Sequence, residues 1–288
     1  MKDGASLDRR LNPYRDDIAG AHLRGEVAAS RFVDGVDRQV VVPSVPLLRR
    51  PETNAPMETQ LVYGETFRVY EEKGGWAWGQ SAHDDYVGYA DAKSLSARLH
   101  EVTHTVAVLR TFIFPKADIK SRPVIGLPMN AKLRVVSAQG SFSVLARGGY
   151  VFTGHLAPLG VHAQDVVTVA EQFEGVPYLW GGRDSLGIDC SGLVQTCLER
   201  AGISSLRDTD MQETALGEPL PLPVDFAKLR RGDLVYWKGH VGIMRDREDL
   251  IHANAAHMRV AIEPLSEAVA RIGKNGTAIS SVKRLARR

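Results

Sequence analysis

Three residues in the second half of the chain have the types that thiol chemistry requires: Cys190, His240 and His252. Cys190 follows a glycine-rich run, residues 178–189, and begins a segment whose apolar residues recur at helical spacing. The sequence therefore predicts a cysteine in the first turn of a helix. The unpaired N–H groups and the helix dipole at that end favour thiolate over thiol, which makes Cys190 a candidate nucleophile. The alternative is a small buried packing residue, as most free cysteines are.

Two histidines follow at positions suited to serving that cysteine. Residues 231–244 contain two short apolar runs joined by a Lys-Gly pair, which predicts a β-hairpin with His240 at the start of its second strand. Residues 249–254 predict another strand, which carries His252. If these strands pair antiparallel, the two imidazoles face each other on one side of the sheet. A cysteine, a histidine base and a polar group that orients the base are the parts of a thiol acyl-transfer site.

The chain from about residue 161 to 286 resembles the NlpC/P60 family of papain-like cysteine peptidases. The resemblance rests on runs in the family's order: Gly175-Val-Pro-Tyr-Leu-Trp-Gly-Gly, Gly187-Ile-Asp-Cys-Ser-Gly-Leu-Val, Leu229-Arg-Arg-Gly-Asp-Leu-Val, Gly239-His-Val-Gly-Ile and Leu250-Ile-His-Ala. It implies Cys190 as nucleophile, His240 as base and His252 as third catalytic residue. It also implies that Tyr178 lies near the site and lends its hydroxyl to the oxyanion.

The resemblance implies a murein peptide as substrate, cleaved between γ-D-glutamate and a diamino acid, meso-diaminopimelate or Lys. A free L-Ala amine on such a peptide needs carboxylates near it, for which Asp189 is the expected residue, with Ser191 assisting. Trp180 is a further expected substrate contact. By likeness to recycling enzymes, Glu65 and Tyr86 would reach the same amine. The alternative is that Glu65 caps a turn and Tyr86 packs in its barrel.

The fold class expected from these patterns is α+β, with a papain-like NlpC/P60 domain preceded by two small barrels. Short alternating strands punctuated by Gly, Asp and Asn predict the first barrel, and a repeat of that pattern predicts the second. Both resemble bacterial SH3 (SH3b) domains, with a generic duplicated β-barrel as the alternative. The predicted domains are a partly helical arm (1–36), the two barrels (37–98 and 99–160) and the peptidase domain (161–288).

Other segments give less specific expectations. Ile18, Leu23, Val27 and Ala28 suggest an amphipathic helix in the arm. Asp165 is expected to cap a helix over residues 166–173. Residues 203–222 read as a polar loop with an Arg…Gln pattern, which in the family lies near the substrate groove and which plain loop explains as well.

The composition and the spacing of histidines and cysteines indicate which partners, cofactors and disulfides to expect. The chain has 288 residues, 44% hydrophobic residues and a formal net charge of +2, which gives no reason to expect nucleic acid or an acidic membrane. The remaining histidines show no metal-ligand spacing, so no metal or other cofactor is expected. Cys190 and Cys197 would lie about 10 Å apart along one helix, beyond the reach of a disulfide, and Cys197 is expected in the core.

The sequence favours a cytoplasmic enzyme, although a chain trimmed of its leader would read the same way. The first ten residues lack the apolar core of a secretory signal, and no apolar run is long enough to span a membrane. A cytoplasmic member would hydrolyse free murein peptides in cell-wall recycling. The alternatives are a wall-binding peptidoglycan hydrolase outside the cytoplasm, or an NlpC/P60-type acyltransferase or amidase. The oligomeric state is left open.

Overall fold

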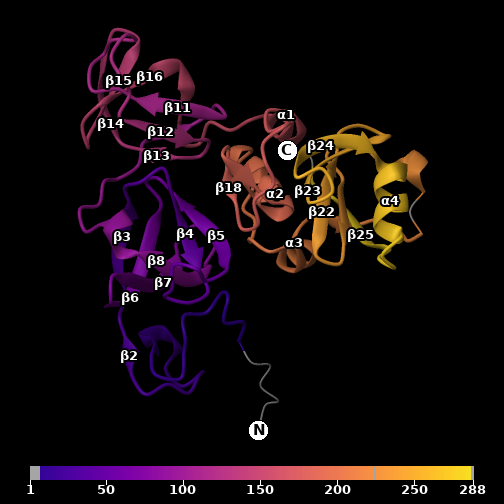
Figure 1. The fold of residues 1–288 in the computed structure, drawn as a ribbon, viewed down its shortest axis with the longest axis horizontal. Helices are drawn as coiled ribbons and strands as arrows, with labels where there is room; N and C mark the ends of the chain where they lie inside the picture. Colours follow the sequence, from indigo (N-terminus) through magenta and orange to yellow (C-terminus); the bar gives the residue numbers. More distant parts are fainter. Residues whose placement is uncertain (1–6, 224, 287–288) are drawn as a thin grey trace. The chain divides into compact units, whose positions relative to one another are not determined.

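A computed structural model describes residues 7–223 and 225–286 (Figure 1). The chain divides into two compact units. One contains residues up to 106 together with 111–159, and the other contains residues 107–110 and those from 160 onward. Each unit is described on its own below.

Over the described residues of the arm, 7–36, there is no amphipathic α-helix, so that expectation for Ile18 to Ala28 was wrong. Its regular structure is a short parallel pair, β1 (Ala19–Gly20) with β2 (Phe32–Val33), and one 3₁₀ turn, η1 (Ala21–Leu23). The turn ends at Arg24, which is extended, and Gly25 follows at φ +88°, a conformation that suits glycine. Ile18 is instead fully buried against Tyr70 and Trp78, so the arm contributes to the core of this unit.

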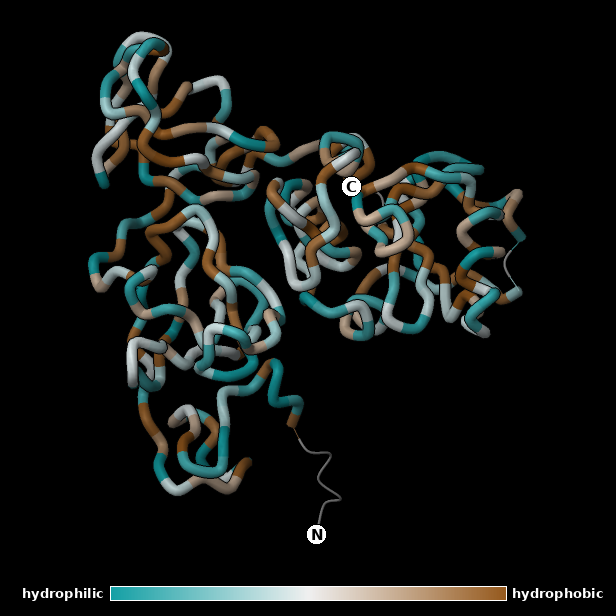
Figure 2. The backbone as a smooth tube through the Cα atoms, in the orientation of Figure 1, coloured by the Kyte–Doolittle hydropathy of each residue, from teal (hydrophilic) through white to brown (hydrophobic). Residues whose placement is uncertain are grey.

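The first predicted barrel forms one antiparallel sheet of seven strands in the order β5-β4-β8-β7-β6-β3-β9. Its strands are β3 (Val36–Val40), β4 (Ser44–Leu48), β5 (Met57–Val62), β6 (Thr66–Lys73), β7 (Trp76–Ser81), β8 (Val87–Asp91) and β9 (Leu95–Ser96). A 3₁₀ turn, η2 (Ala92–Ser94), precedes β9. In Figure 2 hydrophobic and hydrophilic segments follow one another along the tube that forms this sheet. An alternation of the two kinds of residue is the pattern that predicted these strands.

The repeat is built from shorter strands in three small sheets, β13-β10-β17, β11-β12 and β14-β15-β16. The strands are β10 (His104–Val106), β11 (Arg110–Ile113), β12 (Ile125–Pro128), β13 (Lys132–Leu133), β14 (Val135–Gln139), β15 (Phe142–Leu145), β16 (Tyr150–Phe152) and β17 (Leu156–Pro158), with η3 (Thr153–His155) before the last. Phe142 is buried and packs against Phe114 and Phe152 in T-shaped pairs, at ring-centroid distances of 5.9 and 6.3 Å. Such aromatic contacts supply the core that the shortened strands enclose.

The second unit is built on an antiparallel sheet in the order β20-β25-β21-β22-β23-β24. Its strands are β20 (Glu218–Pro219), β21 (Leu234–Trp237), β22 (His240–Met244), β23 (Asp249–Asn254), β24 (Arg259–Pro264) and β25 (Ile279–Arg284), with a separate pair β18 (Arg183–Asp184) and β19 (Gly187–Ile188). Its helices are α1 (Val166–Glu171), α2 (Cys190–Arg200), α3 (Thr209–Ala215) and α4 (Leu265–Gly273), with the 3₁₀ turn η4 (Phe226–Lys228).

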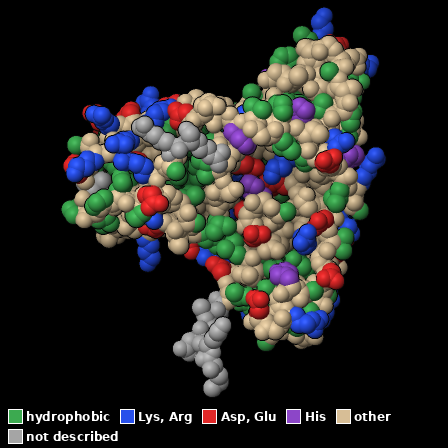
Figure 3. Space-filling view, turned by 180° about the vertical axis from the view of Figure 1, so that it is seen from behind, with side chains coloured by type: hydrophobic (Ala, Val, Ile, Leu, Met, Phe, Trp, Pro, Cys, Tyr) green, Lys and Arg blue, Asp and Glu red, His purple; other side chains and the backbone are tan. Residues whose placement is uncertain are grey.

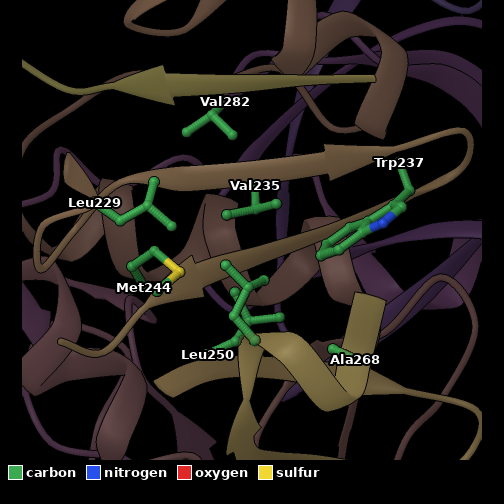
Figure 4. Packing of buried hydrophobic residues seen from close by; sticks show 8 residues of the cluster. Leu229, Val235, Trp237, Met244, Leu250, Ala268 and Val282 are labelled. Carbon is green, nitrogen blue, oxygen red and sulfur yellow. The ribbon is translucent and has the colours of Figure 1, made fainter. Parts of the chain in front are cut away.

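Helices cover the central strands of this sheet. Helix α2 packs against β22 and β23, and α4 packs against β23 and β24 (Figure 1). Figure 4 shows the core beside α4, where Val235 and Trp237 of β21 meet Leu250 and Ala268. Strand β21 is buried at every position, which explains its unbroken run of apolar residues. The central strands that carry the two histidines are therefore held rigidly on a packed core.

Two expectations about this unit were tested by the fold. Asp165 caps α1, since its Oδ1 accepts a hydrogen bond from the Val167 N–H at 2.9 Å, as predicted. The predicted polar loop at residues 203–222 was wrong, because it contains α3 and β20. Helix α3 is short and its Asp208 makes no side-chain cap, so its local sequence signal is weak.

Candidate active site

The predicted helix begins at Cys190, as expected. Asp189 precedes it in extended conformation, and its Oδ1 accepts a hydrogen bond from the Gly192 N–H at 2.7 Å. The glycine-rich run packs closely on this end of the helix: a Cβ on Gly192 would lie 2.2 Å from the Gly182 carbonyl oxygen. Only glycine permits that approach, so the run fixes the position of Cys190.

The thiol of Cys190 does not have the acidity that its position at the helix start predicted. Burial, followed by the charge of Asp189, raises the pKa of Cys190 to about 11. The Val241 N–H and the Thr209 hydroxyl, the latter with its oxygen 3.9 Å from Sγ, lower the pKa without offsetting burial. In this structure Cys190 is therefore a neutral thiol at neutral pH. The position at the helix start predicts a lowered thiol pKa, but the sequence does not reveal how deeply the thiol is buried.

His240 and His252 meet as predicted. Strand β22 pairs antiparallel with β23, and His240 Nε2 lies 2.8 Å from His252 Nδ1. Val241, the next residue after His240, donates its N–H to the thiol, so Cys190 lies against the start of the strand that carries the base. Burial, followed by His252, lowers the pKa of His240 to about 3. The resting site is therefore a neutral thiol beside a neutral imidazole.

A carboxylate that the sequence analysis missed stands behind the two histidines. Glu263 Oε1 lies 2.7 Å from His252 Nε2, and Arg271 of α4 forms an ion pair with the same oxygen. Burial opposes ionisation of Glu263, but the hydrogen bond from His252 and the charge of Arg271 outweigh it and hold the pKa of Glu263 below its ordinary value. The signal was present in the sequence: Ala261 pairs with His252 across the β23–β24 hairpin, so Glu263, two residues on, shares the face of His252.

The Arg…Gln pattern of residues 207–212 belongs to the site. Arg207 is 1% exposed; it donates to Asp189 Oδ2 at 2.7 Å and to Ser191 Oγ at 2.7 Å. Gln212 is fully buried and donates to the Ser191 carbonyl oxygen at 2.9 Å. These two side chains hold the residues on either side of Cys190.

Asp189 is heavily engaged within the protein. Besides Gly192 and Arg207, its carboxylate accepts the Gly181 N–H at 2.7 Å and lies 3.4 Å from the Ser191 hydroxyl. These contacts do not test its predicted binding of a substrate amine, but they give it a structural role that the sequence did not suggest.

The glycine-rich run carries two aromatic residues expected at the site, Tyr178 and Trp180. Burial, followed by the negative charge that Cys190 would carry as a thiolate, raises the pKa of Tyr178, so its hydroxyl stays protonated. Trp180, the expected substrate contact, is 67% exposed.

Glu65 and Tyr86 lie in the first unit and are both buried. Glu65 Oε2 accepts the Val62 N–H at 2.8 Å in its own turn, and Lys132 Nζ lies 3.8 Å from its other oxygen. The Tyr86 N–H points to Asp84 Oδ1 at 3.3 Å. Their expected contact with the substrate stays a prediction.

One group near the site has metal-ligand geometry that spacing in the sequence did not reveal. Ligand atoms of His252, His257 and Glu263 lie within 4.8 Å of one another. The hydrogen bond between His252 and Glu263, and the cation Arg271 on the same carboxylate, already explain the arrangement. Cys190 and Cys197 are both free and buried, so Cys197 is a core residue as predicted.

The second unit has a cysteine at a helix start and paired histidines on the adjoining sheet. These are the parts of a cysteine peptidase site. Comparison with known families agrees with this reading. Residues 175–272 match the NlpC/P60 family model, and residues 47–95 match a model described as the bacterial dipeptidyl-peptidase Sh3 domain.

Relatives and solved structures extend the similarity over most of the chain. Dipeptidyl-peptidase 6 of Lysinibacillus sphaericus is 25% identical over 79% of this chain and 91% of the relative. A γ-D-glutamyl-L-lysine dipeptidyl-peptidase of Bacillus cereus is 28% identical over 74% of this chain and 72% of the relative. The crystal structure of an NlpC/P60 family protein from Bacillus cereus superposes with a TM-score of 0.72 at 19% identity, covering 86% of this chain and 99% of that one.

The chain thus carries an NlpC/P60 peptidase domain behind a bacterial SH3 domain, and the protein is a hydrolase of the NlpC/P60 cysteine peptidase family. Among the described residues, no helix combines the length and the hydrophobicity needed to traverse a lipid bilayer. On the face drawn in Figure 3, several Lys and Arg side chains gather at the left of the view with a few acidic ones among them, and charges are more widely spaced elsewhere.

Proposed function

We propose that this protein is an endopeptidase that hydrolyses the bond between γ-D-glutamate and a diamino acid in murein peptides with a free L-Ala terminus. The observation that carries the proposal is that, within an NlpC/P60 domain, His240 meets His252 and the residue after His240 donates its N–H to the Cys190 thiol. The names of the curated relatives, which this chain matches over most of their length, support the choice of bond.

In the proposed mechanism the thiol and imidazole start neutral. The bound substrate brings its amide carbonyl to Cys190 Sγ, and His240 takes the thiol proton as the sulfur–carbon bond forms. The imidazolium then protonates the leaving amine, the carbon–nitrogen bond breaks, and a thioester remains. His240 next accepts a proton from water as the water oxygen attacks the thioester. The carbon–sulfur bond then breaks, the imidazolium returns that proton to the sulfur, and the γ-carboxyl group of the released glutamate loses its own proton to solvent.

The oxyanion of each tetrahedral intermediate needs donors that are in place before reaction. In the proposal the backbone N–H of Cys190 at the start of α2 serves as one donor and the Tyr178 hydroxyl as a second. The raised pKa of Tyr178 supports this role, because a phenol that stays protonated keeps its hydrogen to donate.

The substrate amine is assigned to Asp189 and Ser191, with Trp180 as a further contact. Asp189 accepts four hydrogen bonds from protein groups, so the amine would bind near a carboxylate whose charge Arg207 already shares. Glu65 and Tyr86 of the first unit stay predicted contributors. They are tested by Glu65→Ala and Tyr86→Phe on the free and muramyl peptides described below.

We assign the reaction to recycling of murein peptides in the cytoplasm. A free L-Ala amine occurs on peptides released from the wall, and intact wall carries a muramyl group there. An enzyme specific for the free amine would therefore act after the sugar has been removed.

The decisive experiment is mass spectrometry of products from L-Ala-γ-D-Glu-meso-diaminopimelate, its Lys counterpart, and each peptide carrying a muramyl group. The proposal predicts release of L-Ala-γ-D-Glu from free peptides only, and none with Cys190→Ala. Cleavage of free and muramyl peptides at equal rates would point to wall hydrolysis. No cleavage of any of them would overturn the proposed substrate.

A further inference from the structure

The residue pair Glu263 and Arg271 stands behind the two histidines and takes no part in the sequence pattern that identified the site. The line of hydrogen-bonded side chains runs from His240 through His252 to Glu263, with 2.8 Å from His240 Nε2 to His252 Nδ1 and 2.7 Å from His252 Nε2 to Glu263 Oε1. His252 is fully buried and Glu263 is 9% exposed. A buried line of this kind fixes where each proton sits.

Arg271 determines whether Glu263 donates or accepts the hydrogen bond with His252. Its guanidinium can only donate hydrogen bonds, and it is paired with Glu263 Oε1. Glu263 Oε1 must therefore act as an acceptor, and His252 Nε2, which faces the same oxygen, must carry the hydrogen.

The remaining proton positions follow from that hydrogen. A neutral His252 protonated at Nε2 has its lone pair at Nδ1, so it accepts a hydrogen from His240 Nε2. His240 then has its own lone pair at Nδ1, the nitrogen that remains for the Cys190 proton. If His252 carried its hydrogen at Nδ1 instead, His240 would hold its proton on Nδ1 and could not accept one from the thiol.

We propose that Glu263, locked by Arg271, is a positioning residue that selects the tautomer in which His240 can act as the base. The proposal rests on the catalytic roles assigned above to Cys190 and His240. Without Glu263, His252 would leave the tautomer of His240 undetermined, because an imidazole can donate or accept a hydrogen at either nitrogen.

Substitution at Glu263 separates its two contributions. Glu263→Leu removes the acceptor and should reduce kcat by about 10²-fold or more with little change in KM, as loss of an orienting group does in other His-dependent sites. In Glu263→Gln, Arg271 keeps the amide oxygen turned toward itself and His252, so the tautomer survives and the loss should be less than about tenfold. The double variant Glu263→Gln/Arg271→Met frees the amide to turn its NH₂ toward His252, and it should lose more than the product of the two single losses.

The control is Glu267→Leu, since Glu267 is an exposed carboxylate on α4, the helix of Arg271. Circular dichroism and thermal unfolding establish that each variant is folded. If Glu263→Leu fails to fold, the Gln variant and its double with Arg271→Met carry the test.

A readout independent of substrate is nitrogen-15 NMR of the histidine rings, because protonated and unprotonated ring nitrogens differ in chemical shift. The wild type should show His252 protonated at Nε2 and His240 at Nε2, and the double variant should show a shift toward the Nδ1 forms. The charged and titratable groups that act on this line are Arg271, Glu263 and His257, so spectra are compared at one pH above the histidine range.

Unchanged tautomers in both the Leu variant and the double variant, or a folded Leu variant with kcat within twofold of wild type, would overturn the proposal. The NMR result stands whatever peptide the enzyme cleaves, so failure of the substrate assignment and failure of this inference are distinguishable.

Discussion

Arg207 Nη2 lies 2.7 Å from Asp189 Oδ2, and both side chains are withdrawn from solvent. This buried ion pair joins the segment before α3 to the cap of the helix that begins with Cys190. The second amino group of Arg207 reaches Ser191 Oγ at 2.7 Å, so one arginine holds the residues on both sides of the nucleophile. The start of the catalytic helix thus depends on a residue far from it in sequence.

Replacing Arg207 with Met should reduce the free energy of unfolding by about 3–5 kcal/mol, because removal of one partner leaves the buried charge of Asp189 uncompensated. Urea unfolding followed by fluorescence measures this loss. The control is Arg247→Met, at an exposed position between β22 and β23, which should change stability by about 0.5 kcal/mol or less. Equal effects of the two substitutions would contradict a buried pair.

Asp189→Asn provides the second half of this test. If the two side chains act as a pair, Asp189→Asn combined with Arg207→Met should cost less than the sum of the single losses, by about 1–3 kcal/mol. Strict additivity would mean that each side chain stabilises the helix start on its own.

Alkylation of Cys190 should be slow at neutral pH and should quicken steadily in alkaline solution. Burial raises the pKa of the thiol to about 11, and raising a thiol pKa disfavours the reactive thiolate at every pH below it. The rate with iodoacetamide is therefore expected to rise about tenfold per pH unit between pH 7 and 10. Cys190→Ala gives the background from Cys197. A rate that levels off below pH 7 would show that the free enzyme holds a thiolate–imidazolium pair.

Features that depend on neighbours in the chain could be predicted from the sequence, and features that depend on the folded chain could not. The helix at Cys190, the hairpin at His240 and the cap at Asp165 depend on neighbours in the chain, and all three form as predicted. Glu263 and Arg207 act through contacts made in the folded chain: the strand register that brings Glu263 to His252, and the ion pair between Arg207 and Asp189, depend on separate segments of the sequence. The acidity of the Cys190 thiol depends on burial, which a helix-start pattern does not reveal.

His252→Ala should lower turnover but leave more activity than His240→Ala. His240 is the proposed proton acceptor, so its loss should reduce kcat by about 10²–10⁴-fold. His252 acts on the reaction only through the hydrogen bond at its Nδ1, and water in the space left by its ring could satisfy His240 Nε2. Steady-state kinetics on L-Ala-γ-D-Glu-meso-diaminopimelate compare the two variants. Equal losses in two folded variants would give both histidines a direct part in proton transfer.

The arm at the start of the chain should stabilise the first unit through Ile18. Its side chain is fully buried against Tyr70 and Trp78, so Ile18→Ala leaves a cavity and should cost about 2–5 kcal/mol. Val36→Ala is the matched control, because Val36 is 53% exposed and its truncation should cost less than about 1 kcal/mol. Denaturant unfolding gives both free energies, and Trp78 fluorescence reports whether the ring loses its packing. An Ile18→Ala variant as stable as Val36→Ala, with unchanged fluorescence, would mean that the arm contributes nothing to the core of this unit.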